Sequence, residues 1–359
     1  MIPDLDRNFR SDNNAGIAPE IVDALLAENA RKDDGYGRDA LTAKLDAAWS
    51  EVFETAVHVV PVVSGTAANA IALAMIAPSH GVIFTHKHSH TLADEVNAPG
   101  FLNPGITIAP IDGAHGFVTP DNLAAAVSPR RALSVNRPRP AALSITQCTE
   151  VGTAYDVSQL AQLQAVADEN GLAIHMDGAR FANAVAYFRC APAELTWKVG
   201  VKVLSLGAAK NGCLNTEAIV LFDEEDKQRW WYRVKQSGGL VAKLRFNSAQ
   251  LLAYAKSGLW LDNASHANAR ARQLVELLAA SELKPLHPVQ GNEVFLKLSG
   301  ATVERLRRDG YTFHWDEASG SARFVTAFDT SEEAVDALVD NLTKHTRALA
   351  GRPDWVALP

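Results

Sequence analysis

Residues 175–180, which read His-Met-Asp-Gly-Ala-Arg, decide the fold. The apolar run 172–176 ends directly before Asp177 and predicts a buried strand, and the small residues after it predict a turn. Asp177 then stands at the carboxyl end of a strand, where open α/β sheets bind their ligands. The alternative is an aspartate that only caps the following helix.

Six more apolar, β-branched runs predict strands on either side of this one, at residues 57–63, 82–85, 106–109, 142–146, 201–205 and 218–222. Nearly continuous apolar runs are typical of strands that are covered on both faces, and helical segments separate several of them. We therefore predict an α/β fold with a seven-stranded, mainly parallel sheet. The last run follows its predecessor without an intervening helix, so we expect it to be antiparallel.

Beyond residue 240 the pattern changes to a long helical region. It is followed by apolar segments and helical spacing that predict a second layer of strands and helices, at residues 294–299, 303–308, 311–315, 322–328 and around 335–342. We predict a large domain of residues 1–245, whose N-terminal segment contributes to the site, and a smaller C-terminal α+β domain of residues 246–359.

The composition favours a small-molecule substrate. The chain has 34 basic and 41 acidic residues, and this mildly acidic balance argues against nucleic acid or a membrane surface as a partner. The apolar runs are shorter than the roughly 18 residues that a membrane span needs. The start of the chain lacks the pattern of an export signal, and the three cysteines fit neither a disulfide framework nor a zinc motif. We expect a cytoplasmic protein with reduced thiols.

Lys210 lies in a turn of small residues after the strand predicted at 201–205. A solvated surface lysine is the simplest interpretation, but an aspartate and a lysine at neighbouring strand ends can meet in one crevice. Upstream, Ser64, Gly65 and Thr66 open an alanine-rich helix, whose N-terminus is either an ordinary capped start or a phosphate site. Pyridoxal 5'-phosphate (PLP) needs an anion site, a carboxylate for its ring nitrogen and an amine.

Three motifs in this order carry a resemblance: SGTAAN at 64–69, HMDGARFANA at 175–184 and LSLGAAKNG at 204–212. They resemble the fold-type-I, transferase-like PLP-dependent enzymes. With FRSDN at 9–13 and DDGYG at 33–37, the chain resembles the threonine aldolase family over nearly its whole length. The resemblance implies that Lys210 carries PLP as a Schiff base, that Asp177 pairs with the ring nitrogen, and that Arg180 lies near the cofactor and the substrate carboxylate.

Further roles follow from the same resemblance. Ser11 and Arg323 would bind the substrate carboxylate, and Tyr36 would line the site of a neighbouring subunit. Arg245, with Lys243 as the alternative, would reach the cofactor phosphate. Each of these residues also has a structural interpretation, as a cap, a surface arginine or part of a glycine-rich turn. Because the family shares sites between subunits, we expect a homodimer or a homotetramer.

Three histidines, His86, His88 and His90, follow the strand predicted at 82–85 at every second position. In an extended segment they share one face and could bind a metal. The resemblance implies instead that His90 stacks on the PLP ring and takes part in the base step. We therefore predict no metal site.

Glu150 marks a departure from the family, many of whose members have a histidine at this position. A carboxylate can accept a β-hydroxyl proton, so His90, Glu150 or an intervening water is the expected base. The resemblance implies cleavage of L-threonine, L-allo-threonine or related β-hydroxy-α-amino acids such as phenylserine to glycine and an aldehyde.

Three other functions compete with this one. The same lysine and aspartate serve β-eliminating lyases and aminotransferases of the same fold, a metal-dependent hydrolase would use the three histidines with Asp177, and a binding protein would lack catalysis.

Overall fold

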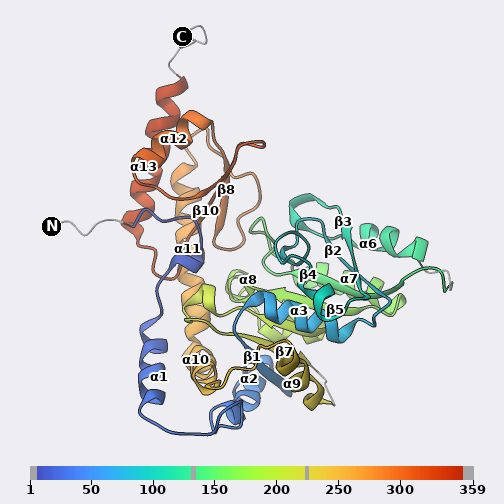
Figure 1. Cartoon of the computed structure of the whole chain (residues 1–359). Helices are drawn as coiled ribbons and strands as arrows, with labels where there is room; N and C mark the ends of the chain where they lie inside the picture. Colours follow the sequence, from blue (N-terminus) through green and yellow to red (C-terminus); the bar gives the residue numbers. More distant parts are fainter. Residues whose placement is uncertain (1–5, 131–134, 223–225, 351–359) are drawn as a thin grey trace.

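The computed structural model describes residues 6–130, 135–222 and 226–350. Figure 1 shows the large sheet with its helices and, apart from it, a small sheet packed on α12 and α13, with α11 running between the two. Among the described residues no helix is long and apolar enough to cross a membrane.

The large sheet has seven strands in the order β1-β7-β6-β5-β4-β2-β3. Strand β7 is antiparallel to both of its neighbours, and the remaining pairs are parallel. The predicted mainly parallel sheet is therefore confirmed, including the antiparallel run. The strands are β1 (Val57–Val62), β2 (Gly81–His86), β3 (Thr107–Ile111), β4 (Arg139–Thr146), β5 (Ala173–Gly178), β6 (Val201–Leu206) and β7 (Glu217–Phe222).

The register of the central strands positions the site. Thr146 of β4 pairs with Asp177 of β5, which in turn pairs with Ser205 of β6. The three strands are parallel, so their carboxyl ends meet at one edge of the sheet. The segments that follow them, with Glu150 after β4 and Lys210 after β6, leave the sheet at this edge.

Helices cover both faces of the sheet because its strands are apolar on both sides. One face packs against α3 and α9, and the other against α2, α7, α8 and the first half of α11. The helices of this part are α1 (Pro19–Asn29), α2 (Leu45–Phe53), α3 (Gly65–Ile76), α4 (His90–Ala93), α5 (Ala98–Leu102), α6 (Pro120–Val127), α7 (Val157–Glu169), α8 (Phe181–Phe188), α9 (Lys227–Gln236) and α10 (Arg245–Ala255).

The small domain is a three-stranded antiparallel sheet in the order β8-β10-β9, packed on helices. Its elements are α11 (Leu259–Leu278), β8 (Glu293–Lys297), α12 (Gly300–Arg308), β9 (His314–Asp316), β10 (Ser321–Val325) and α13 (Glu332–Ala350). The predicted α+β character is confirmed. Trp260 and Ala264 of α11 belong to the large core, whereas Ala271 and Leu274 belong to the small one. We therefore propose a domain boundary within α11, later than residue 245.

Candidate active site

The carboxyl ends of the central strands open into a cavity of about 890 Å³, which the small domain and the N-terminal segment also line. We call it the central cavity. Its lining includes all of the predicted site residues except Tyr36 and Arg245, namely Ser11, Ser64, Gly65, Thr66, His90, Glu150, Asp177, Arg180, Lys210 and Arg323.

Asp177 is held at the end of β5 by two donors. The Asn69 side-chain nitrogen donates to Asp177 Oδ2 at 2.8 Å, and the backbone N–H of Ala179 donates to Oδ1 at 3.1 Å. Asn69 also donates to Glu95 Oε1 at 2.9 Å, which accepts a second hydrogen bond from His90 Nδ1 at 2.8 Å. The hydrogen bond to Glu95 raises the pKa of His90 against the effect of burial. A continuous chain of polar contacts therefore runs from His90 to Asp177.

Lys210 lies in the short 3₁₀ turn Ala209–Asn211 between β6 and β7. Within the described residues its ammonium has no hydrogen bond or ion pair, although it lines the central cavity. The turn itself is fixed, because Glu217 accepts from the backbone N–H of Ala208 at 2.5 Å and Asn211 donates to the Tyr254 hydroxyl at 2.6 Å. Burial raises the pKa of Glu217 to about 7. A turn fixed by hydrogen bonds thus presents the Lys210 side chain to the cavity.

The N-terminus of α3 faces the same cavity. Ser64 is its N-cap, because the Ser64 hydroxyl accepts from the backbone N–H of Ala67 at 3.2 Å. The interpretation of Ser64 as a helix cap is therefore correct, and it leaves a phosphate site at this turn possible. A Cβ atom at Gly65 would meet nothing within 4 Å, which leaves open space beside the first turn. Thr66 adds a hydroxyl to the lining. Free backbone N–H groups and the helix dipole make this end suited to an anion.

A cluster of two arginines and two acids forms the side of the cavity next to the small domain. Arg180 donates two hydrogen bonds to Asp12, from Nε at 2.8 Å and from Nη2 at 2.9 Å, and its Nη1 lies 3.3 Å from Glu293 Oε2. Arg323 Nη1 lies 3.6 Å from Glu293 Oε1, and its Nη2 donates to the backbone carbonyl of Arg10 at 3.4 Å. We call these four charged residues the arginine cluster. Arg180 is therefore already held by protein carboxylates.

Glu150 lies between the strand ends and His90. Its Oε1 accepts hydrogen bonds from the Thr146 hydroxyl at 2.8 Å and from the backbone N–H of His90 at 2.9 Å. Its Oε2 is buried and has no partner in the described structure. Burial raises the pKa of Glu150 to about 7.

Sequence reasoning gave no role to several polar residues that line the cavity or lie behind its lining. The N-terminal motif placed Ser11 at the site, where its hydroxyl accepts from the backbone N–H of Asn13 at 3.2 Å, but not its neighbour Asp12. Asn69 closes the SGTAAN motif, so a spacing of one helical turn from Gly65 was an available signal. Glu217 closely follows the motif at 204–212, and Glu293 lies far from every motif. Both stand in otherwise apolar strands, and only the three-dimensional structure places them in the cavity.

Two predicted residues lie outside this chain's cavity. Tyr36 is 47% exposed, and the Lys235 ammonium lies over its ring at 4.7 Å. The Arg245 guanidinium is paired with Glu28 at 2.8 Å. Contact of Arg245, or of Lys243, with the cofactor phosphate stays a prediction. A role for Tyr36 in a neighbouring subunit stays a prediction.

The histidines do not converge as metal ligands would. His86 Nε2 donates to the Gly113 carbonyl, and His90 pairs with Glu95. The buried His175 is satisfied by two serine hydroxyls, those of Ser144 and Ser205, and burial lowers its pKa to about 4. Among the described residues no group of three or more histidine, cysteine or acidic side chains is placed to hold a metal ion.

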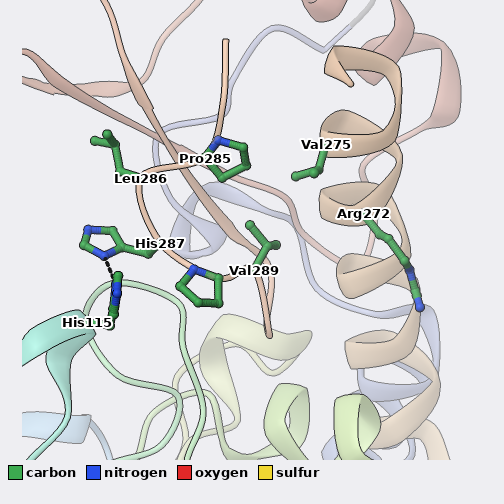
Figure 2. A pocket seen from close by; sticks show the side chains of 8 residues that line it. His115, Arg272, Val275, Pro285, Leu286, His287 and Val289 are labelled. Carbon is green, nitrogen blue, oxygen red and sulfur yellow. Dashed lines mark hydrogen bonds between the residues drawn. The ribbon is translucent and has the colours of Figure 1, made fainter. Parts of the chain in front are cut away.

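A second, shallower hollow lies where the segment before β8 meets the large domain. Figure 2 shows His115 and His287 pointing toward each other across it, with a distance of 3.0 Å between their Nδ1 atoms. Neither residue lines the central cavity.

The seven-stranded sheet, with its cavity at the carboxyl strand ends and a separate small domain beside it, is the fold of the fold-type-I enzymes. A solved structure of threonine aldolase from Leishmania major superposes with a TM-score of 0.88 at 24% identity, over 94% of this chain and 99% of that chain.

A family model described as β-eliminating lyase matches residues 8–301. Two curated relatives, both low-specificity L-threonine aldolases, are similar over 94% of this chain and 98% of their own length: one from Pseudomonas sp. strain NCIMB 10558 at 37% identity, and one from Pseudomonas aeruginosa at 38%. The chain belongs to the β-eliminating lyase family, and within it to the low-specificity L-threonine aldolases. The resemblance found in the sequence is therefore confirmed.

Proposed function

We propose that the chain is a PLP-dependent aldolase that cleaves β-hydroxy-α-amino acids, such as L-threonine, L-allo-threonine or phenylserine, to glycine and an aldehyde. The observation that carries the proposal is the meeting of Lys210, Asp177 and the N-terminus of α3 in the central cavity. A lysine side chain with no hydrogen bond or ion pair among the described residues, a carboxylate at a strand end and open space beside Gly65 fit the cofactor's three requirements.

Lys210 would hold the cofactor covalently, Asp177 would pair with its ring nitrogen, and Ser64, Gly65 and Thr66 would bind its phosphate. When bound, PLP supplies a protonated ring that takes up the electron pair of a bond broken at Cα. Asn69 orients the Asp177 carboxylate through its hydrogen bond at 2.8 Å, and so would hold that carboxylate toward the ring nitrogen of the cofactor. His90, on the rim of the cavity, would cover the ring.

Arg323 and Ser11 would bind the substrate carboxylate, because both line the cavity beside the small domain. Arg180 would contribute to the same region through Nη1, which lies 3.3 Å from Glu293, since Asp12 occupies Nε and Nη2. Fixing the carboxylate sets which bond of Cα stands perpendicular to the ring and breaks.

We propose Glu150 as the base that accepts the β-hydroxyl proton. Its Oε2 accepts no hydrogen bond from the part of the chain that the structure describes, and its pKa of about 7 suits proton transfer near neutral pH. His90 is less suited, because the hydrogen bond to Glu95 raises its pKa and favours the protonated ring.

We also propose a homodimer or homotetramer with shared sites. Val63 and Leu214 are apolar, line the cavity and are 39% and 51% exposed, which a partner subunit would cover. Tyr36 is exposed outside its own cavity and would then complete the partner's site.

Product analysis tests the proposed reaction. The holoenzyme is incubated with L-threonine, L-allo-threonine and phenylserine, and the products are quantified. Glycine and aldehyde in equal amounts support the aldolase. Ammonia with a keto acid would instead indicate a β-eliminating lyase, and amino-group transfer to an added keto acid an aminotransferase.

The absorbance of the purified protein tests the cofactor separately. We expect visible absorbance that the Lys210→Ala variant loses, while Lys202→Ala, which removes an exposed lysine of β6, keeps it. A colourless wild-type protein that does not take up added PLP contradicts the cofactor assignment.

A further inference from the structure

Glu293 is a buried acid in the region where the substrate's negative charge is expected. It is the first residue of β8, its side chain is 0% exposed, and it lines the central cavity. Within the described residues neither of its carboxylate oxygens accepts a hydrogen bond. Its ion-pair partners among the described residues are Arg180 at 3.3 Å and Arg323 at 3.6 Å. Neither the family resemblance nor the proposed reaction gives this residue a role.

The arginine cluster is electrically neutral when all four side chains are ionised, because Asp12 and Glu293 balance Arg180 and Arg323. Asp12 is held firmly in the arginine cluster, because it accepts two hydrogen bonds from Arg180 and one at 3.0 Å from the Asn292 side chain. Glu293 is held more weakly, because its distances to Arg180 and Arg323 exceed ordinary hydrogen-bond length. A substrate carboxylate at Arg323 would add a third negative charge to two arginines.

The other charged or titratable groups around Glu293 do not neutralise the extra negative charge of the substrate carboxylate. The Lys210 ammonium acts on it favourably from a distance, and Asp12 acts unfavourably. The Cys148 thiol stays neutral, because burial raises its pKa to about 12. His314 of β9 lies on the exposed rim of the cavity. Burial raises the pKa of Glu293 above its ordinary value, although Arg180 and Arg323 oppose this effect. The raised pKa makes Glu293 easier to protonate than an exposed glutamate.

We propose that Glu293 sets the affinity of the site for the substrate's α-carboxylate by taking up a proton from solvent when that carboxylate binds at Arg323. The inference rests on the proposed function in one respect, namely that the ligand is an α-amino acid with a free carboxylate. Protonation restores a neutral cluster, because the substrate's charge replaces that of Glu293. The product glycine carries the same carboxylate, so ionised Glu293 also favours its release. Glu293 is thus a positioning and charge-balancing residue that acts through Arg323.

The test is a calorimetric titration of the holoenzyme with β-hydroxybutyrate. This probe has the carboxylate and the β-hydroxyl of threonine but no amine, so it is not cleaved. Titrations in buffers of different ionisation enthalpy give the number of protons taken up. For the wild type we expect net proton uptake and an affinity that falls with rising pH, approaching roughly tenfold per pH unit above the pKa of free Glu293. Glu293→Gln should bind the probe more tightly at alkaline pH, by about tenfold or more, without this proton uptake.

The direction in which Glu293→Gln changes the affinity for the probe distinguishes the proposal from a purely structural role of Glu293. If Glu293 only held the two arginines in place, Glu293→Gln would bind the probe more weakly than the wild type, and this result overturns the proposal. The same holds for a wild type that takes up no proton. Glu293→Ala is a second neutral variant should the glutamine variant not fold, and Asp309→Asn, which loses a carboxylate paired with His345 elsewhere in the small domain, should behave as the wild type. The titration does not depend on turnover, so absent aldolase activity would refute the proposed reaction without deciding the role of Glu293.

Discussion

Asn69 connects the two carboxylates that stand behind the proposed cofactor position, since its single side-chain nitrogen donates to both Asp177 and Glu95. We predict that Asn69→Ala lowers the affinity for PLP and destabilises the holoenzyme by about 1 to 3 kcal/mol, because two buried carboxylates lose their shared donor. PLP titration and thermal unfolding measure the two effects. Asn122→Ala, which removes a side-chain hydrogen bond to a backbone carbonyl of the large domain, is the control and should leave PLP affinity unchanged. Unchanged PLP affinity in Asn69→Ala as well would refute this role.

Glu150 gives the site a defined pH dependence. A base must be deprotonated to accept the β-hydroxyl proton, and burial places the pKa of Glu150 at about 7. We therefore predict that kcat rises with pH through about 7. Glu150→Gln should lower kcat by roughly 10² to 10⁴-fold and lose this rising limb. If Glu150→Gln keeps both the wild-type kcat and its rise with pH, another group is the base, and His90 is the first candidate.

Single residues were predictable where a motif surrounds them. Asp177 lies at the end of β5, and Arg180 and Lys210 follow strands within short runs of small residues. The order of these runs along the chain predicted the site. Glu293 could not be found in this way, because its neighbours form an ordinary apolar strand and its partners Arg180 and Arg323 lie far away in the sequence. The pairing of Arg180 with Asp12 was likewise hidden, since 168 positions separate the two residues.

Helix α3 offers a test at the level of an element. Gly65 stands in its first turn with open space where a side chain would begin, so Gly65→Ala should fold and serves as the uncharged comparison, with only a small loss of PLP affinity from its methyl group. Gly65→Asp adds a negative charge beside the proposed phosphate site. We predict that it weakens PLP binding by about tenfold or more, measured by titration of the apoenzyme. Equal PLP affinity in the two variants would place the phosphate elsewhere.

The strands were predictable because burial on both faces leaves a continuous apolar signal, and each predicted run overlaps a strand of the large sheet. The ends were less predictable. Residues 177 and 178 extend β5 beyond its apolar run, because Asp177 continues the ladder with β4 and β6 although its side chain is polar. The order of the strands in the sheet was not predicted, since pairing depends on contacts between segments that are distant in the sequence.

For the molecule as a whole, a shared site predicts complementation between two inactive variants. Lys210→Ala and Tyr36→Ala are each expected to lose most activity. In a mixed dimer one of the two sites would combine an intact Lys210 with the partner's intact Tyr36. Equal amounts of the two variants, unfolded and refolded together, should therefore recover about a quarter of the wild-type activity. No recovery in a mixture that demonstrably forms mixed dimers would assign Tyr36 to its own subunit or to no site.

The two-domain arrangement explains why the substrate end of the cavity was harder to predict than the cofactor end. The cofactor end is built from consecutive strand ends of one sheet, whereas the arginine cluster joins η1 (Asp12–Asn14), the start of α8, β8 and β10. Such a junction depends on how the small domain sits on the large one, and no local pattern encodes it.

The cofactor and catalytic roles proposed for the cavity depend on Lys210 as the residue that carries PLP. Reduction of the holoenzyme with borohydride makes the link between lysine and cofactor permanent, and mass spectrometry of a protease digest then locates it. We predict a single modified peptide that contains Lys210. Modification of another lysine, or none in protein that has bound PLP, would contradict this assignment.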